Sequence, residues 1–263
     1  MAQTLAEIRE ALKAANRAEY EALSRALAAD ERKGVKAALK SAARRFAAED
    51  AEAARLEGMY SFQAKLAGGG IAVGLDEVGR GPVAGPLAIG AVVLPDDPRV
   101  EGVNDSKQLS AERREEIAAV VREVAIAWDI EYIQPQEIDE HGMTWALRMA
   151  NLRAIAAIEE QLSAKGASLD AVLLDGNAQH LDAREVNIVK GDGKCASIAA
   201  ASIIAKVDRD ALMCRYAERF PHYGFESNKG YASAEHIEAI KQYGLSPVHR
   251  ASFCRAWTQE TLF

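Results

Sequence analysis

A run of three glycines at residues 68–70 divides the chain into two stretches with different sequence patterns. Residues 1–66 contain 20 alanines, two glycines and no proline, a composition typical of α-helix. After the glycines, short apolar runs rich in β-branched residues alternate with helix-length stretches, which is typical of α/β proteins. We therefore predict an all-helical N-terminal domain over residues 1–66, a flexible joint, and a larger α/β domain.

The apolar runs of the larger domain predict a sheet of five strands with flanking helices. The strands are expected over residues 71–75, 87–94, 124–133, 171–174 and 186–189. The helices are expected over residues 110–121, 144–162 and 195–220, with another beginning near residue 233. Helical spacing of apolar residues in the N-terminal domain predicts two or three packed helices there.

Composition and charge exclude several classes of protein. Hydrophobic residues make up 49% of the chain and charged residues 27%, which excludes collagen-like, mucin-like and wholly disordered chains. Without a signal peptide or an apolar run of roughly 20 residues, we expect a cytoplasmic protein with no membrane partner. The net charge of −7 argues against a general polyanion binder, although carboxylates gathered around a metal would give the same balance.

Carboxylates follow three of the predicted strands. Asp76 and Glu77 end the first strand, Asp175 ends the fourth, and Asp192 follows the fifth. Ligands of open α/β sheets bind in the crevice beyond the strand ends, so these side chains are expected to converge. Because successive side chains of a strand point to opposite faces, Asp76 and Glu77 share one site only if the backbone turns at once.

Four neighbouring carboxylates repel one another unless cations neutralise them. Ligation by oxygen alone selects Mg²⁺ or Mn²⁺ over zinc, and two such ions are suited to phosphoryl displacement. An isolated acidic pair such as Asp76-Glu77 is more often a solvated turn, but here it recurs with two further strand ends. The pattern therefore predicts a two-metal site that acts on a phosphodiester.

Seven motifs of the chain, in the same order along it, resemble those of the bacterial ribonuclease HII family. They span residues 74–82, 104–110, 174–176, 190–192, 197–207, 228–231 and 247–250. The resemblance covers about residues 71–257, the predicted catalytic domain, and leaves residues 258–263 as a tail. It implies that Asp76, Glu77, Asp175 and Asp192 are both the catalytic residues and the ligands of Mg²⁺ or Mn²⁺.

The resemblance further implies a ribonuclease H-like mixed sheet and hydrolysis of the phosphodiester 5′ to a ribonucleotide, leaving 3′-hydroxyl and 5′-phosphate ends. The expected substrates are RNA–DNA hybrids and duplex DNA with embedded ribonucleotides. By the same resemblance, the Gly79-Arg80-Gly81 segment touches the ribose 2′-hydroxyl, Tyr231 supports the adjoining deoxyribose, and Lys107 binds substrate.

Two alternatives to this function stay open. A ribonuclease HIII-like hybrid nuclease generally carries Gly-Thr-Gly after its acidic pair, and Arg80 points away from that family. A non-catalytic hybrid-binding protein would not need four carboxylates at strand ends.

Basic residues recur every four positions in the N-terminal domain, at Arg32, Lys36, Lys40 and Arg44. This spacing keeps them on one side of a helix, where they could follow the phosphates of a DNA backbone. The alternative is a solvated face, because Lys and Arg outnumber Asp and Glu by only two in residues 1–66.

The last five residues resemble the short peptides with which bacterial replication and repair proteins dock on the sliding clamp. Gln259, Leu262 and Phe263 carry this resemblance. The alternative is a frayed helix end with two loosely packed apolar residues. We expect the protein to be a monomer.

Overall fold

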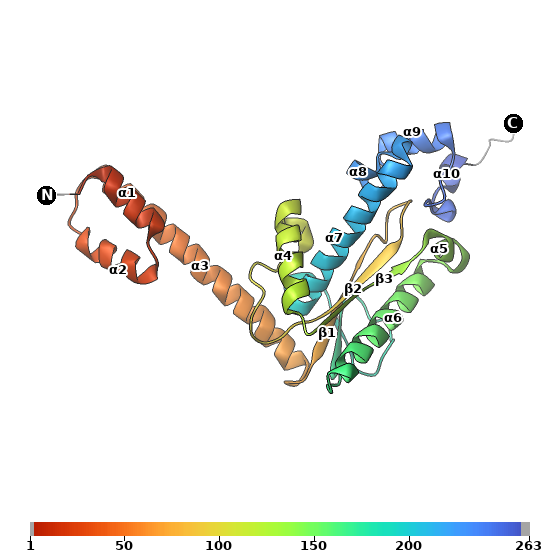
Figure 1. Ribbon diagram of the computed structural model, residues 1–263, viewed down its shortest axis with the longest axis horizontal. Helices are drawn as coiled ribbons and strands as arrows, with labels where there is room; N and C mark the ends of the chain where they lie inside the picture. Colours follow the sequence, from red (N-terminus) through yellow and green to blue (C-terminus); the bar gives the residue numbers. More distant parts are fainter. Residues whose placement is uncertain (1–2, 259–263) are drawn as a thin grey trace. The chain divides into compact units, whose positions relative to one another are not determined.

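The computed structural model describes residues 3–258, and the chain divides after Glu57 into two compact units. The N-terminal unit consists of α1 (Leu5–Ala14), α2 (Arg17–Ala26) and the first part of α3 (Lys33–Leu66), which agrees with the predicted packed helices (Figure 1). Thr4 and Asn16 begin the first two helices with capping boxes, which satisfy their free amide groups. The buried core of this unit contains Ile8, Leu12, Val35 and Ala42.

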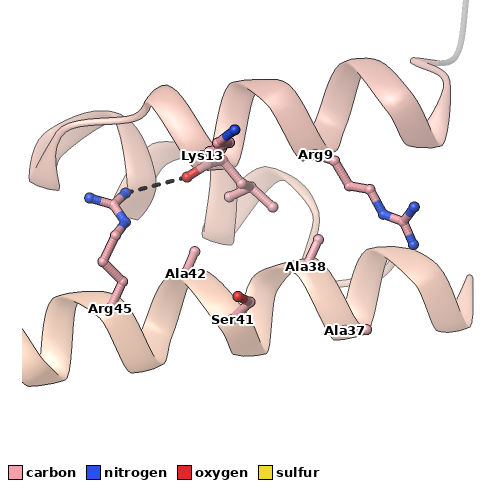
Figure 2. A pocket seen from close by; sticks show the side chains of 8 residues that line it. Arg9, Lys13, Ala37, Ala38, Ser41, Ala42 and Arg45 are labelled. Atoms are coloured by element: carbon pink, nitrogen blue, oxygen red, sulfur yellow. Dashed lines mark hydrogen bonds between the residues drawn. The ribbon is translucent and has the colours of Figure 1, made fainter.

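A groove of about 400 Å³ lies between α1 and α3 within the N-terminal unit. Figure 2 shows its cationic side chains, which are Arg9, Lys13 and Arg45. The Arg45 guanidinium donates hydrogen bonds to the carbonyl oxygens of Leu12, at 3.3 Å, and Ala15, at 2.8 Å. These carbonyls belong to the end of α1, so Arg45 completes the hydrogen bonding of a helix terminus.

The last turns of α3 belong to the second unit. The Tyr60 hydroxyl accepts a hydrogen bond from the Val100 amide at 3.0 Å, and Gln63 Oε1 accepts one from the Ser197 amide at 2.9 Å. The compact units thus divide inside α3, which continues as one helix from Lys33 to Leu66, the residue predicted to end the N-terminal domain.

The second unit is built on a five-stranded mixed sheet in the order β3-β2-β1-β4-β5. Its strands are β1 (Ala72–Val78), β2 (Leu87–Val93), β3 (Ala127–Ile133), β4 (Ala171–Asp175) and β5 (Glu185–Ile188). The first three pair antiparallel, whereas β4 is parallel to both β1 and β5. The predicted α/β class and all five predicted strands are confirmed.

Helices cover both faces of this sheet (Figure 1). On one face α6 (Met143–Ala164) packs over a core that includes Val73, Leu75 and Ile89. On the other face lies α7 (Ala196–Arg219), against which α4 (Ala111–Val124) packs. The remaining elements are α5 (Pro135–His141), α8 (Phe225–Asn228), α9 (Ala234–Tyr243), α10 (Arg255–Thr258), and the 3₁₀ turns η1 (Ser106–Gln108), η2 (Gly191–Gly193), η3 (Pro221–Tyr223) and η4 (Ala251–Phe253).

Helix α7 approaches the strand backbones closely because a glycine faces it from each of the neighbouring strands β1 and β2. A methyl group at Gly74 of β1 would lie 2.3 Å from the Ile198 amide nitrogen, and one at Gly90 of β2 would lie 2.2 Å from the Ala201 carbonyl oxygen. Residues 196–205 of α7 are all buried. The close packing brings polar residues of α7 next to the end of β1.

None of the helices between residues 3 and 258 has both the length and the apolar character that a membrane crossing requires.

Candidate active site

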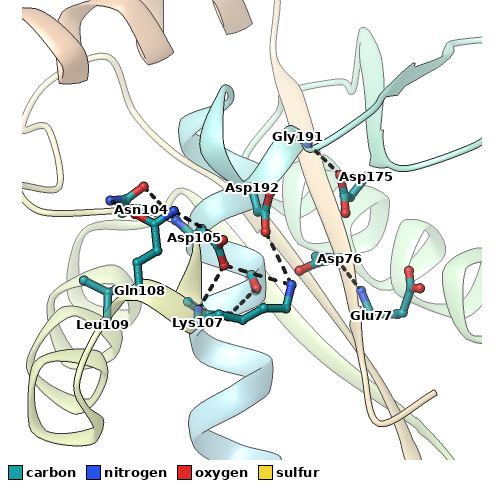
Figure 3. Close-up of polar contacts among 12 residues, drawn as sticks. Asp76, Glu77, Asn104, Asp105, Lys107, Gln108, Leu109, Asp175, Gly191 and Asp192 are labelled. Carbon is teal, nitrogen blue, oxygen red and sulfur yellow. Dashed lines mark hydrogen bonds and ion pairs between the residues drawn. The ribbon is translucent and has the colours of Figure 1, made fainter. Parts of the chain in front are cut away.

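The four predicted carboxylates come from three elements that end at one edge of the sheet. Asp76 and Glu77 lie near the end of β1, Asp175 is the last residue of the neighbouring parallel strand β4, and Asp192 lies in η2 after β5. Gly191 couples two of these elements, because its amide donates a hydrogen bond to Asp175 Oδ1 at 2.6 Å. Figure 3 shows the resulting group.

Asp76 and Glu77 face opposite sides of the sheet, because β1 continues to Val78 before the chain turns at Gly79. The Asp76 carboxylate is hydrogen-bonded with Ser202 of α7. The Glu77 side chain lines a groove of about 410 Å³ on the α6 side, together with Asp175. The chain therefore does not turn at once after Asp76. The two carboxylates still influence one another, because the charge of Glu77 raises the pKa of Asp76 and the charge of Asp175, at the end of β4, raises the pKa of both.

Burial is the main cause that raises the pKa of Asp76 to about 7. The hydrogen bond with Ser202 opposes this shift, while the charges of Glu77 and Asp175 add to it. Burial also raises the pKa of Glu77 and that of Asp192, and in both cases the charge of Asp175 raises it further. The site therefore holds partly buried carboxylates that repel one another.

The donor set fits a hard divalent cation, because its oxygen atoms all come from carboxylates and their repulsion is what such a cation relieves. No three His, Cys, Asp or Glu side chains within residues 3–258 lie close enough together to hold a metal ion as they stand. Part of the negative charge is instead offset by Lys107, whose Nζ atom lies 3.8 Å from Asp192 Oδ2 (Figure 3).

The predicted ribose-binding segment follows β1 next to the carboxylates, with Gly79 buried and Arg80 and Gly81 exposed. Arg80 Nη1 is 3.5 Å from Glu77 Oε1, and a methyl group at Gly81 would lie 3.7 Å from the Tyr231 ring. Tyr231 is 52% exposed, which is unusual for an aromatic residue that only packs. The structure therefore brings the segment 79–81 and Tyr231 together, although they are 150 residues apart in sequence.

Three polar residues of the site received no role from the sequence. Asp105 raises the pKa of Asp192 and lies 4.0 Å from Lys107 Nζ. Ser106 is hydrogen-bonded to Ser202, with 2.9 Å between the two Oγ atoms, and Ser202 in turn contacts Asp76. All three belong to motifs that carry the family resemblance, so the sequence did mark these positions. Their contacts could not be predicted, because they form only when α7 packs beside β1 and residues 105–106.

A chain of hydrogen bonds through two buried histidines supports the backbone of Tyr231. The Ser246 amide donates to His249 Nδ1 at 2.9 Å, so the proton of His249 is on Nε2. The Nε2–H group of His249 donates to His236 Nε2 at 3.0 Å, and His236 Nδ1 donates to the Tyr231 carbonyl at 2.7 Å. The chain requires both imidazoles to be neutral.

Replacing His249 with glutamine is expected to make the free energy of unfolding fall less between pH 7 and pH 4.5 than it does in the parent chain. Burial, with repulsion from His236, lowers the pKa of His249 from 6.5 to about 4. The unfolded chain therefore takes up this proton first as the pH falls. The contribution of neutral His249 to the free energy of unfolding is complete above pH 6.5. It falls by about 3 kcal/mol as the pH decreases towards 4. The check is the free energy of unfolding by urea at pH 7 and pH 4.5.

The matched control for this prediction is His222→Gln, because His222 is exposed. The control should retain the pH dependence of the parent chain. An equally steep loss of stability in the His249 variant would show that this histidine does not remain neutral in the fold.

The predicted basic residues of the N-terminal unit are all exposed, but two of them are paired. Arg32 forms an ion pair with Asp30, with 2.6 Å between Nη2 and Oδ2, and Lys36 Nζ lies 2.5 Å from Glu31 Oε2. In the described part of the chain, neither Lys40 nor Arg44 has a carboxylate within 4.0 Å. Gln259, Leu262 and Phe263, the predicted clamp-binding residues, lie outside the described residues.

Sequence comparison finds two family models on this chain. One, described as ribonuclease HII, matches residues 73–256, and the other, its N-terminal domain, matches residues 4–67. A ribonuclease HII of Ruminiclostridium cellulolyticum is 43% identical over 212 residues, covering 80% of this chain and 81% of the relative. One of Clostridium acetobutylicum is 41% identical over 232 residues, covering 86% and 88%.

Solved structures agree with this fold. The crystal structure of ribonuclease H2 from Pyrococcus horikoshii matches with a TM-score of 0.59 and 28% identity, over 71% of this chain and 96% of that one. RNase HII of Archaeoglobus fulgidus, solved in a complex with PCNA, matches with a TM-score of 0.59 and 29% identity, over 73% and 98%. Bst-RNase HIII in complex with Mn²⁺, at 21% identity and a TM-score of 0.58 over 73% and 71%, shares the fold.

Proposed function

Because the chain belongs to the ribonuclease HII family and is thus a metal-dependent type 2 ribonuclease H, we propose that it hydrolyses the phosphodiester 5′ to a ribonucleotide. The substrates are RNA–DNA hybrids and duplex DNA with embedded ribonucleotides. The products carry 3′-hydroxyl and 5′-phosphate ends. We retain the expectation of a cytoplasmic monomer.

One juxtaposition supports this proposal most strongly. The carboxylates at the ends of β1 and β4 lie beside a loop segment, residues 79–81, in which Arg80 and Gly81 are exposed, and beside an exposed tyrosine, Tyr231. The carboxylates suit a cation that acts on a phosphodiester, while the loop and the ring suit a sugar next to that phosphodiester. A substrate that spans both must present a ribose close to the bond that is cut.

Each group has a distinct part in the proposed reaction. Asp76, Glu77, Asp175 and Asp192 would hold two Mg²⁺ or Mn²⁺ ions, which when bound supply Lewis acidity at the scissile phosphate. Residues 79–81 bind the ribose 2′-hydroxyl, and Tyr231 supports the adjoining deoxyribose. Lys107 neutralises charge beside Asp192 and contacts the substrate backbone.

The test is cleavage of a DNA duplex that contains one ribonucleotide, with Mg²⁺ and with Mn²⁺ separately, beside an all-DNA duplex of the same sequence. Incision 5′ to the ribonucleotide, with no cutting of the all-DNA duplex, is the expected result. Cutting only within runs of ribonucleotides would favour HIII-like specificity. Binding of hybrid without cutting under either metal would contradict the proposed reaction.

For the N-terminal unit we propose a contact with the phosphates of duplex DNA through the basic residues of α3. Replacing Lys40 and Arg44 together with glutamine should weaken duplex binding and lower the slope of log affinity against log salt concentration by about 1 to 2. The reason is that these two cations have no carboxylate partner among residues 3–258. Fluorescence anisotropy over a salt series measures the slope.

The double variant Arg32→Gln and Lys36→Gln is the control, because both residues already pair with carboxylates. Its salt slope should change less than that of the Lys40 and Arg44 variant. Equal slopes in the parent chain and in both variants would make α3 a packing element only.

For residues 259–263 we propose docking on a sliding clamp, and the Archaeoglobus fulgidus relative in complex with PCNA supports it. Deleting Leu262 and Phe263 should abolish clamp binding while cleavage of naked duplex stays unchanged. Burial of the two side chains would contribute roughly 1.5 to 3 kcal/mol each before ordering costs, so micromolar affinity is expected. An intact chain without affinity for the clamp at physiological salt would overturn this proposal.

A further inference from the structure

We infer that two buried arginines, Arg209 and Arg250, are positioning residues that hold the ribose-binding loop in its working shape. The inference rests on the proposed function, since it explains how that loop would recognise a ribose. We define the ribose loop as residues 79–86, between β1 and β2.

All the side-chain hydrogen bonds of Arg250 go to carbonyl oxygens of the ribose loop. Its guanidinium donates to Gly79 at 2.6 Å, Pro82 at 2.8 Å, Gly85 at 3.0 Å and Arg80 at 3.1 Å. The Arg250 amide adds a bond to the Val83 carbonyl at 2.8 Å. One fully buried side chain therefore binds the loop at four places.

Arg209 of α7 joins the other end of the ribose loop to the segment before Tyr231. Its guanidinium donates to the carbonyls of Pro86 at 2.9 Å and Ala84 at 3.2 Å, and also to that of Lys229 at 3.1 Å. A methyl group at Gly79 would lie 2.2 Å from Arg209 Nε, so glycine at this position makes room for the arginine.

Neither arginine has a carboxylate within 4.0 Å in the described part of the chain, although both are at most 1% exposed. A buried guanidinium without a carboxylate in contact is costly, and the carbonyl dipoles of the loop stabilise it here, with Asp139 near Arg250 and Asp210 near Arg209 acting from a longer range. Burial, with repulsion from Arg209, accordingly lowers the pKa of Arg250 to about 9. An apolar side chain would fill the same space with a smaller desolvation penalty. We therefore assign the two arginines the role of fixing the conformation of the loop.

Because Arg250 fixes two carbonyl groups of the ribose loop, it also fixes the direction of the amides in the same peptide units. In a planar trans peptide the N–H points opposite to the C=O. The carbonyls of Gly79 and Arg80 point inward to Arg250, so the amides that share their peptide units, those of Arg80 and Gly81, point outward. Within residues 3–258 no acceptor takes up either amide, and both residues are exposed.

The ribose loop thus presents two backbone donors beside Tyr231 and the carboxylates. Two outward amides suit the oxygen atom of a 2′-hydroxyl or of the adjoining phosphate. If Arg250 no longer held the two carbonyls, the peptide units could rotate and the donors would be lost. The arginine would then influence recognition of the ribose without touching it.

The test is the full-length variant Arg250→Lys, which keeps a positive charge but carries all its donors on one nitrogen. Its affinity for a duplex with one ribonucleotide and for the all-DNA duplex of the same sequence is measured without divalent metal. The ratio of the two affinities should fall by about tenfold, while all-DNA binding stays within about twofold of the parent chain. A merely structural defect would weaken both affinities together.

Arg122→Lys is the control, because Arg122 pairs with Asp208 and lies over the Trp128 ring, and within residues 3–258 it makes no hydrogen bond to the ribose loop, so it should leave the ratio unchanged. An unchanged ratio in folded Arg250→Lys would overturn the inference. If the parent chain itself shows no preference for the ribonucleotide and does not cut beside it, the proposed function fails instead, which keeps the two failures distinct.

A second measurement needs no variant and tests the two outward amides on which the inference depends, even if Arg250→Lys does not fold. The backbone amide resonances of Arg80 and Gly81 in the parent chain are followed by NMR during titration with each duplex. Both should shift with the ribonucleotide-containing duplex more than with the all-DNA duplex. Equal or absent shifts of these two amides would overturn the inference.

Discussion

Replacing Asp76 or Asp175 with asparagine or alanine is expected to reduce metal-dependent cleavage of a ribonucleotide-containing duplex by about a thousandfold or more. Each carboxylate is expected to hold metal, and each influences the charge of its neighbours at the meeting ends of β1 and β4. Binding of the duplex should largely persist, since the substrate contacts come from other residues. Single-turnover cleavage and anisotropy measure the two effects separately.

Asp208→Asn is the matched control for these variants. The Asp208 carboxylate pairs with Arg122 of α4, as expected of an acidic residue in the charged stretch that follows the apolar part of α7. Its replacement should cost up to about 1 kcal/mol of stability and leave the cleavage rate intact. Normal cleavage rates in the Asp76 or Asp175 variants would contradict the assignment of the active site.

Replacing Gly74 with alanine is expected to destabilise the second unit by about 3 kcal/mol. The added methyl group would lie 2.3 Å from backbone atoms of Ser197 and Ile198, which cannot move aside as a flexible side chain would. Helix α7 would have to shift away from β1, and Ser202 would move away from Asp76. Urea unfolding measures the loss, and a lowered cleavage rate in the folded fraction should accompany it.

Gly58→Ala provides the opposite control, because a methyl group there has no atom within 4 Å and the residue lies inside α3. Alanine at that position should stabilise the helix by up to about 1 kcal/mol. If Gly74→Ala unfolds at the same urea concentration as the parent chain, the close packing of α7 on β1 is wrong.

Much of the fold follows from local patterns in the sequence. Short apolar runs between turn residues predict the five strands, because a strand is defined by a few consecutive residues. The helix predicted to begin near residue 233 does so, because Ser233 caps it by accepting a hydrogen bond from the His236 amide at 3.2 Å. The division after Glu57 has no local signal in the sequence, since α3 continues through it as one helix without a glycine run or a proline.

The sequence by itself determined the α/β class, the carboxylates at the strand ends and the family, because each depends on residue types at fixed spacing along the chain. Only the tertiary structure decided that Asp76 faces α7 while Glu77 faces α6. Arg209 lies between two aspartates in sequence, a position typical of a solvated residue. The tertiary structure instead buries it against the ribose loop. The physical reason is that Ser202, the partner of Asp76, and Pro86, a partner of Arg209, each lie more than 120 residues away in sequence. Such contacts arise only when the packing of a helix on the sheet brings both backbones together.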